Sequence, residues 1–106
     1  VVTLERTERA RAEFAYRAAI KLAIANVEKS SPLRASQRQA LLDLLADTPP
    51  PKAMGQYTNY YVMYQMAKVQ DQIQELLDAG QMQAMRQVFA QGQGMAQFLK
   101  QHGYID

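Results

Sequence analysis

Hydrophobic residues recur every three or four positions along most of the chain, which is the spacing of amphipathic α-helices. Five segments carry this pattern: residues 4–29, 35–46, 57–69, 71–77 and 81–101. No segment shows the strict alternation and tight Gly-containing turn that indicate a β-hairpin. The pattern therefore predicts an all-α fold, a compact bundle of four to five helices, in a single domain of residues 1–106.

The first of these segments carries a wide apolar stripe. Its members follow one another at intervals of four, four and three residues: Phe14, Ala18, Leu22 and Ala25. The residues beside that line are also apolar: Ile20, Ile24 and Val27. A stripe of this kind is typical of a helix that packs on its neighbours. Pro32 ends the helix, because the residue before a proline avoids the helical region.

A run of tyrosines follows the second helical segment. Three prolines, Pro49 to Pro51, favour an extended and stiff connector, and the stretch GQYTNYYVMYQM begins at residue 55. A strand is the alternative for so aromatic a segment, but it would place Tyr60 and Tyr61 on opposite faces. The tyrosines instead stand at i, i+3, i+4 and i+7, which is one face of a helix.

The tyrosine face has three interpretations at this point: packing, contact with a protein partner and, as the least favoured, catalysis. Its rings suit packing on this domain's core or on another domain, with the hydroxyl groups at the rim. They also suit contact with a protein partner. The candidate partner-binding residues are Tyr57, Tyr60, Tyr61 and Tyr64. Stacking of nucleic-acid bases needs basic neighbours, whereas only Lys52 and Lys68 flank the tyrosines, so we expect no nucleic-acid partner.

The last helical segment holds two glycines, Gly92 and Gly94, inside its pattern. Such glycines either let another helix approach closely or kink the helix that carries them. Asp78 precedes this segment and is a candidate N-cap. Gly103 follows it and suits a left-handed helix stop.

The composition argues against most enzyme chemistries. The chain has no cysteine and a single histidine, His102, so it lacks the ligand cluster of a zinc site. His102 lies near the C-terminus, where we expect it to interact with helix-end carbonyls rather than to act in catalysis. Asp71, Glu75 and Asp78 share a helical face, and a solvated acidic face is favoured there over a metal site. We therefore expect no enzyme, no catalytic residue, no metal and no cofactor.

The charge and length of the chain limit its partners. The formal net charge is only +2, from 12 basic and 10 acidic residues, so the clustered basic surface of a nucleic-acid binder is not expected. No run approaches the ~20 apolar residues that a membrane span requires. The chain begins Val1-Val2-Thr3, with neither an initiator Met nor a signal peptide, and we expect it to be a piece of a longer protein.

Two parts of the sequence resemble known families. The stretch from Leu33 to Leu41 is similar to the LTxxQ-type helix start of periplasmic stress chaperones and metal sensors: Leu33 and Gln37 match, and Arg34 stands where that motif has Thr or Ser. The segments PPK, GQY, YYVMYQ and GMAQFLKQHGY resemble the C-terminal region of a family of exported, largely helical planctomycete proteins of unknown function. This second resemblance spans nearly the whole chain. It implies export and a missing N-terminal part, and it brings no catalytic residues.

The leading hypothesis from the sequence is a non-enzymatic helical interaction domain of the bacterial periplasm or cell envelope. Its contacts would be with a protein partner, or with the missing N-terminal part of its own chain. The surfaces that would make them are the tyrosine helix and the acidic face. The alternative hypothesis is a periplasmic chaperone or metal-responsive sensor of the LTxxQ kind.

Overall fold

A computed structural model describes the backbone of residues 2–53 and 55–106, and the side chains of residues 7–53 and 55–106. Over these residues the chain forms six α-helices and no strand, which confirms the predicted all-α class. The helices are α1 (Val2–Ser30), α2 (Ala35–Ala46), α3 (Thr58–Lys68), α4 (Gln70–Leu76), α5 (Ala79–Gln93) and α6 (Ala96–Gln101).

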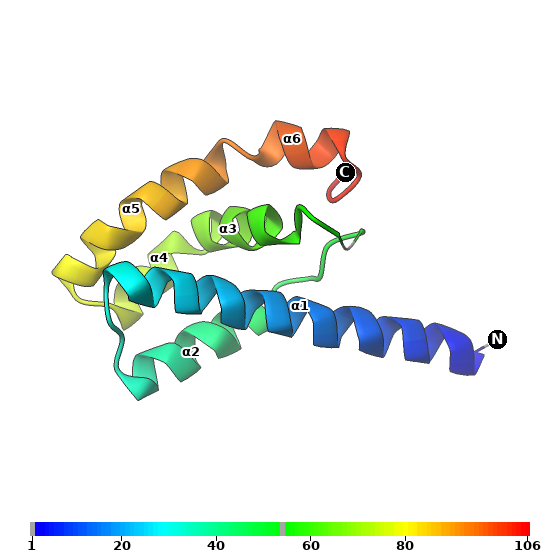
Figure 1. Ribbon diagram of the computed structural model, residues 1–106, viewed down its shortest axis with the longest axis horizontal. Coiled ribbons are helices and arrows are strands. Elements are labelled where there is room, and N and C mark those ends of the chain that lie inside the picture. Colours follow the sequence, from blue (N-terminus) through cyan, green and yellow to red (C-terminus); the bar gives the residue numbers. More distant parts are fainter. Residues whose placement is uncertain (1, 54) are drawn as a thin grey trace.

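The helices form an elongated bundle with extents of 48 × 30 × 21 Å. Helix α1 runs along the long axis, and its N-terminal turns extend beyond the other helices (Figure 1). Helix α2 returns against one side of α1, and α5 with α6 arches over the opposite side of the bundle (Figure 1). Helix α3 is central, because it contacts each of the other five helices. Helix α3 therefore carries the tyrosines into the middle of the molecule.

The face of α1 that packs inward carries Ile20 and Ile24 from one side of the predicted stripe, and not the central line of that stripe. The buried side chains of α1 are Tyr16, Ile20, Ala23 and Ile24. The predicted stripe of Phe14, Ala18, Leu22 and Ala25 lies on the exposed side of the helix. Both lines have helical spacing, but the inward line carries the branched isoleucines and Tyr16. That line therefore removes more apolar area from water than a line in which two of four members are alanine.

The predicted last helix, residues 81–101, is broken in two. Helix α5 ends at Gln93 with Gly94 as its C-cap, and α6 begins at Ala96. Gly92 has a different role from Gly94: a Cβ atom at residue 92 would lie 2.2 Å from the carbonyl oxygen of Met63 on α3. Each of the two alternatives predicted for these glycines therefore occurs: helices approach closely at Gly92, and the helix breaks at Gly94.

Two glutamines join the beginnings of α2 and α5. Gln37 Nε2 donates to Gln81 Oε1 over 2.8 Å, and Gln81 Nε2 donates back to Gln37 Oε1 over 3.0 Å. The same two amides also bind backbone groups of Arg34, Leu76, Asp78 and Pro32. Each amide therefore uses all four of its hydrogen-bonding positions. Asp78 caps α5 as predicted, because its Oδ1 accepts from the backbone N–H of Gln81 over 2.8 Å.

Candidate functional site

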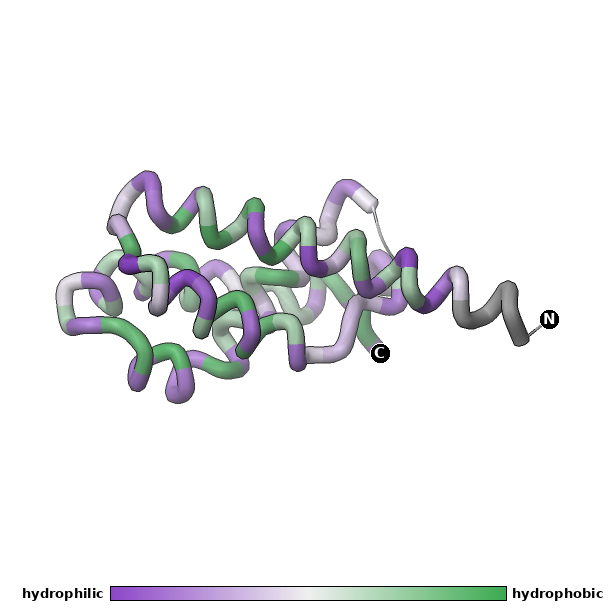
Figure 2. The backbone as a smooth tube through the Cα atoms, turned by 90° about the horizontal axis from the view of Figure 1, so that it is seen from below, coloured by the Kyte–Doolittle hydropathy of each residue, from purple (hydrophilic) through white to green (hydrophobic). Residues whose placement is uncertain are grey.

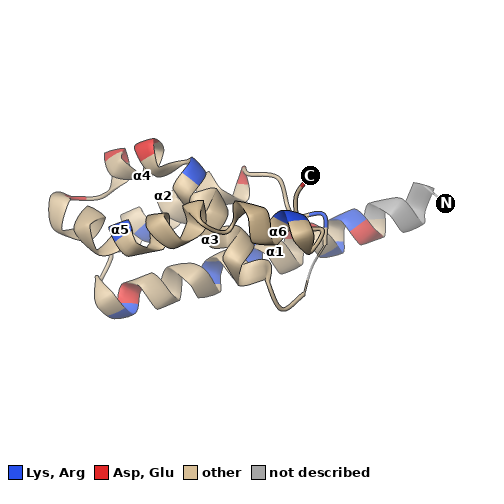
Figure 3. Cartoon of the chain, turned by 90° about the horizontal axis from the view of Figure 1, so that it is seen from above, with Lys and Arg blue, Asp and Glu red and all other residues tan. Residues whose placement is uncertain are grey.

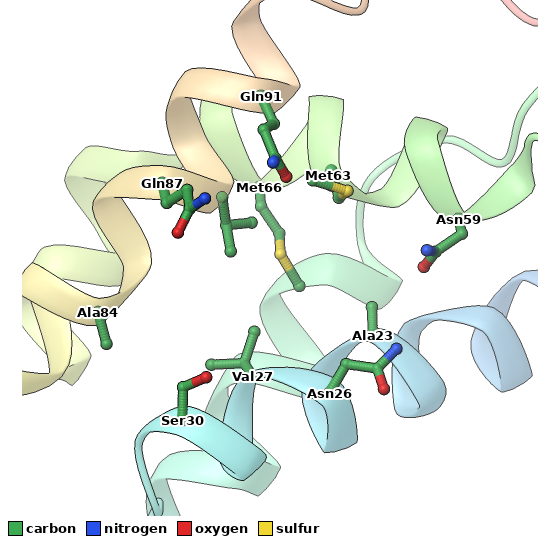
Figure 4. A pocket seen from close by; sticks show the side chains of 11 residues that line it. Ala23, Asn26, Val27, Ser30, Asn59, Met63, Met66, Ala84, Gln87 and Gln91 are labelled. Carbon is green, nitrogen blue, oxygen red and sulfur yellow. The ribbon is translucent and has the colours of Figure 1, made fainter.

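A cleft of about 330 Å³ opens between α1, α3 and α5 (Figure 4). Its apolar lining residues are Ala23, Val27, Met63, Met66, Ala84 and Val88. Its polar lining residues are Asn26, Ser30, Asn59, Gln87 and Gln91. The amide side chains come from all three helices and surround the apolar centre to which Met66 and Val27 extend (Figure 4).

The cleft exists because the three helices approach one another unequally. Gly92 brings α5 so close to α3 that no side chain fits between their backbones at that point. Helix α1 packs chiefly on α2 and α3, and it contacts α5 at few positions. Short side chains, Ala23 on α1 and Ala84 on α5, line the two walls that face each other. The space between α1 and α5 therefore stays open instead of closing into the core.

The chemistry of this cleft suits non-covalent binding. None of its 11 lining residues is acidic, basic or aromatic. General acid–base catalysis needs a titratable group within hydrogen-bond reach of the substrate, and no lining residue supplies one. Amide side chains both donate and accept hydrogen bonds without carrying charge. The local pattern carries only a weak signal for this site. Gln87 and Gln91 are one helical turn apart beside apolar Val88, but the residues of α1 and α3 that complete the lining come together only in the fold.

Of the four candidate tyrosines, Tyr61 lies in the core. It is 3% exposed. Its hydroxyl group donates to the carbonyl oxygen of Pro49 over 2.6 Å and accepts from Gln65 Nε2 over 2.8 Å. Burial raises the pKa of Tyr61. A partner could reach this ring only after it left the core, so we assign Tyr61 a structural role and leave it out of the proposed contact surfaces.

The other three tyrosines keep part of their surface exposed. Tyr57 and Tyr60 stack on each other with ring centroids 5.9 Å apart. The rings of Phe98 and His102 on the α6 side lie 4.7 Å from the ring of Tyr57. Tyr64 is half-buried under Lys68, whose Nζ lies 5.3 Å from the ring centroid. The tyrosine face is therefore a packing seam with a partly exposed rim.

His102 is part of this aromatic cluster. Its ring centroid lies 4.3 Å from that of Phe98. Its backbone forms the C-cap of α6, at the helix end where the sequence placed it. The neighbouring Gly103 has a φ of 79°, which matches the left-handed stop predicted there.

The acidic residues Asp71, Glu75 and Asp78 are all exposed. Those of α4 lie on the side of the molecule away from α1 (Figure 3). Asp78 is already bound to the first turn of α5 through its carboxylate. In the part of the chain that the structure describes, no three Asp, Glu, His or Cys residues are arranged to hold a metal ion.

The outward side of α1 is the most exposed apolar surface of the described chain. Phe14 is 78% exposed and Leu22 is 62% exposed. The tube coloured by hydropathy shows hydrophobic positions recurring along α1 between hydrophilic ones (Figure 2). Four exposed cations accompany this stripe: Arg11, Arg17, Lys21 and Lys29. The central line of the predicted stripe therefore faces solvent, whereas Ile20 and Ile24 beside it pack in the core.

Comparisons of the chain with family models, with curated proteins and with solved structures found no significant match. Within the described residues, no helix has the length and apolar character needed to cross a membrane.

Proposed function

We propose that this chain is a protein-interaction domain that docks a helix of its partner on the outward side of α1. The observation that carries the proposal is the exposure of Phe14 and Leu22 on a helix whose opposite side is already in the core. A helix that is apolar on two sides is typically covered on both. Covering a fully exposed Phe or Leu side chain contributes about 1.5–3 kcal/mol, so this surface favours a partner.

The alternation of residue sizes along the stripe favours a helical partner. Phe14 and Leu22 project from the surface, whereas Ala18 and Ala25 are short and lie between and beyond them. Helices pack when the side chains of one fit into the gaps of the other, and small residues allow a short distance between the two axes. A stripe that alternates large and small residues offers such gaps at Ala18 and Ala25.

The charges around the stripe favour an acidic partner. Arg11 and Lys29 continue its line at both ends, and Arg17 and Lys21 lie along one edge. Glu13 and Glu28 lie on or close to the same edge, and the carboxylate of Glu28 is bound by Arg38 over 2.5 and 2.7 Å. The four cations therefore outnumber the acidic residues beside the stripe. A second copy docked by the same stripe would bring the same cations into contact, and like charges across an interface oppose binding. We therefore propose an amphipathic helix with acidic residues beside its apolar stripe.

The test uses two designed helical peptides of about 20 residues, with identical Leu and Ala stripes. One peptide carries Glu on both sides of the stripe, and the other carries Lys. Fluorescence anisotropy should show saturable binding of the Glu peptide. We expect Phe14→Ser combined with Leu22→Ser to weaken that binding by about tenfold or more, because the two anchors of the surface are lost.

The matched control is Ala90→Ser, an exposed position on α5, and it should leave peptide binding unchanged. Equal binding of the Glu and Lys peptides would contradict the charge argument. Unchanged binding in the double variant would contradict the proposed surface. Binding of the wild-type chain to anionic lipid vesicles, with no binding of the Glu peptide, would replace the protein partner with a membrane surface.

The resemblance to exported helical proteins supports a location in the bacterial periplasm or cell envelope. We propose this location for the protein from which the chain comes. Fractionation of cells that produce the full-length protein should place it outside the cytoplasm, and its recovery only with cytoplasmic markers would contradict the proposal.

A further inference from the structure

We propose that the cleft between α1, α3 and α5 is a binding site for a small, uncharged and largely apolar molecule that carries a hydrogen-bonding group. The site is separate from the outward stripe of α1, because Ala23 and Val27 line it from the inward half of that helix. The inference therefore does not depend on the helix-docking proposal.

The size of the cleft fits a small molecule. Its volume is about 330 Å³, at the lower end of the roughly 300–1,000 Å³ that is typical of ligand pockets. Its lining residues come from three helices, α1, α3 and α5 (Figure 4). Met66 lines the cleft and is 0% exposed, so this side chain closes the floor.

The lining determines the charge of the ligand. A charged molecule would lose hydration on entering, and no lining residue carries the opposite charge to compensate for that loss. An uncharged molecule loses less hydration free energy on entering the cleft. It finds apolar contacts on Met63, Met66 and Val88, and methionine adapts its shape to irregular ligands.

The amides determine the orientation of the ligand. Gln87 and Gln91 extend from α5, and Asn26 and Asn59 extend from α1 and α3 on the other side of the apolar centre (Figure 4). Each of these groups both donates and accepts hydrogen bonds. A hydroxyl, carbonyl or amide group of the ligand would bind at this rim, while the apolar part of the ligand lies on the methionines.

The test titrates the chain with two fluorescent probes of similar size, the neutral N-phenyl-1-naphthylamine and the anionic 1-anilinonaphthalene-8-sulfonate. We expect saturable binding of the neutral probe and at least about tenfold weaker binding of the sulfonate. Ala84→Phe fills the cleft and should abolish binding of the neutral probe. The matched control is Ala90→Phe, which adds the same ring at an exposed position of α5 and should leave probe binding intact.

Two further measurements keep the test decisive if Ala84→Phe disturbs folding. Asn59→Lys adds a cation at the exposed rim and should strengthen sulfonate binding relative to the neutral probe. In methyl NMR spectra, the neutral probe should shift the methionine signals of Met63 and Met66 and leave that of Met95 unchanged. Equal affinity for the two probes, shifts at Met95 alone, or undiminished binding in a folded Ala84→Phe variant would overturn the proposal.

The outcome is distinguishable from that of the peptide test. Phe14→Ser with Leu22→Ser should leave probe binding unchanged, since neither side chain lines the cleft. Loss of probe binding in that double variant would assign the probe to the α1 stripe and overturn the cleft proposal.

Discussion

Gln37 and Gln81 illustrate how two uncharged side chains can specify the contact between two helix starts. Each caps its own helix by accepting from the backbone N–H three residues earlier, over 2.9 Å in both cases. Each then uses its remaining positions on the other glutamine and on a backbone carbonyl. Both side chains are buried. The geometry of one helix start therefore depends on that of the other.

Replacing Gln37 with Ala should lower the free energy of unfolding by about 2–3 kcal/mol. The reason is that Gln81 would keep buried groups with no partner, and an unsatisfied buried polar group costs about 1–3 kcal/mol. Chemical denaturation in urea measures the change. The control is Gln39→Ala on the same helix, whose side chain binds only Asp43 at the exposed surface. It should change the free energy of unfolding by less than about 0.5 kcal/mol, and equal losses in the two variants would contradict the proposed role of the pair.

At the scale of helices, the sequence pattern predicts the existence of the elements better than their orientation. The predicted range 35–46 equals the bounds of α2, because Pro32 and Pro49 mark both ends. The predicted central line of the apolar stripe on α1 was wrong, since two apolar lines with helical spacing run along that helix and spacing alone does not rank them. The sequence does not decide whether the helix breaks between α5 and α6. A glycine pair suits either a kink or a close contact until the neighbouring helix is known.

The candidate site shows the same limit of the sequence. Its amides and methionines come from three helices that lie far apart in the chain, and no local pattern connects Asn26 with Gln91. The cleft arises from one unequal contact, the close approach of α5 to α3 at Gly92. The sequence shows which amides and methionines are present, whereas tertiary packing decides that they come together at one site.

Substituting Gly92 with Ala tests this close contact. The added Cβ would lie 2.2 Å from the carbonyl oxygen and 2.7 Å from the carbonyl carbon of Met63, so α5 must move away from α3. We expect a loss of about 1–3 kcal/mol in the free energy of unfolding, despite the gain of about 1 kcal/mol in helix propensity from Gly to Ala.

Gly94→Ala is the matched control for that substitution. Its nearest contacts, 3.6 and 3.7 Å, leave room for a methyl group, and its φ of −77° is accessible to alanine. The Gly94 variant should therefore be as stable as the wild type or more stable. If thermal unfolding gave the same destabilisation for both variants, the contact at Gly92 would not be what limits the approach of α5.

At the scale of the whole molecule, two buried tyrosines attach the proline connector to the bundle. Thr48 donates its hydroxyl hydrogen to the carbonyl oxygen of Leu45 over 2.5 Å, so the Tyr16 hydroxyl is the donor in its 2.5 Å bond with Thr48. Tyr61 donates to Pro49, the next residue of the connector. The rings of Tyr16 and Tyr61 contact each other with centroids 5.6 Å apart. The connector between α2 and α3 is thus held from α1 and from α3 at the same point.

This arrangement predicts a specific loss of stability at high pH. Burial raises the pKa of Tyr16 to about 12, from its ordinary value of 10.0. Between these two values the unfolded chain releases the proton while the folded chain keeps it. The free energy of unfolding therefore falls as pH rises through this window, by up to about 1.4 kcal/mol per pH unit for this one group, and Tyr16 contributes no pH dependence below it.

The Tyr16→Phe variant isolates the contribution of this hydroxyl. At about pH 8 it should be less stable than the wild type by about 1 kcal/mol, because the bond to Thr48 is lost. Its denaturation midpoint should then fall less steeply between about pH 10 and pH 11, so that the difference between the two proteins narrows. Tyr61 keeps titrating in the variant, since burial raises its pKa as well, and some slope will remain. Parallel curves for the two proteins over this range would mean that Tyr16 does not stay protonated in the folded chain, and that its burial does not hold the connector as described.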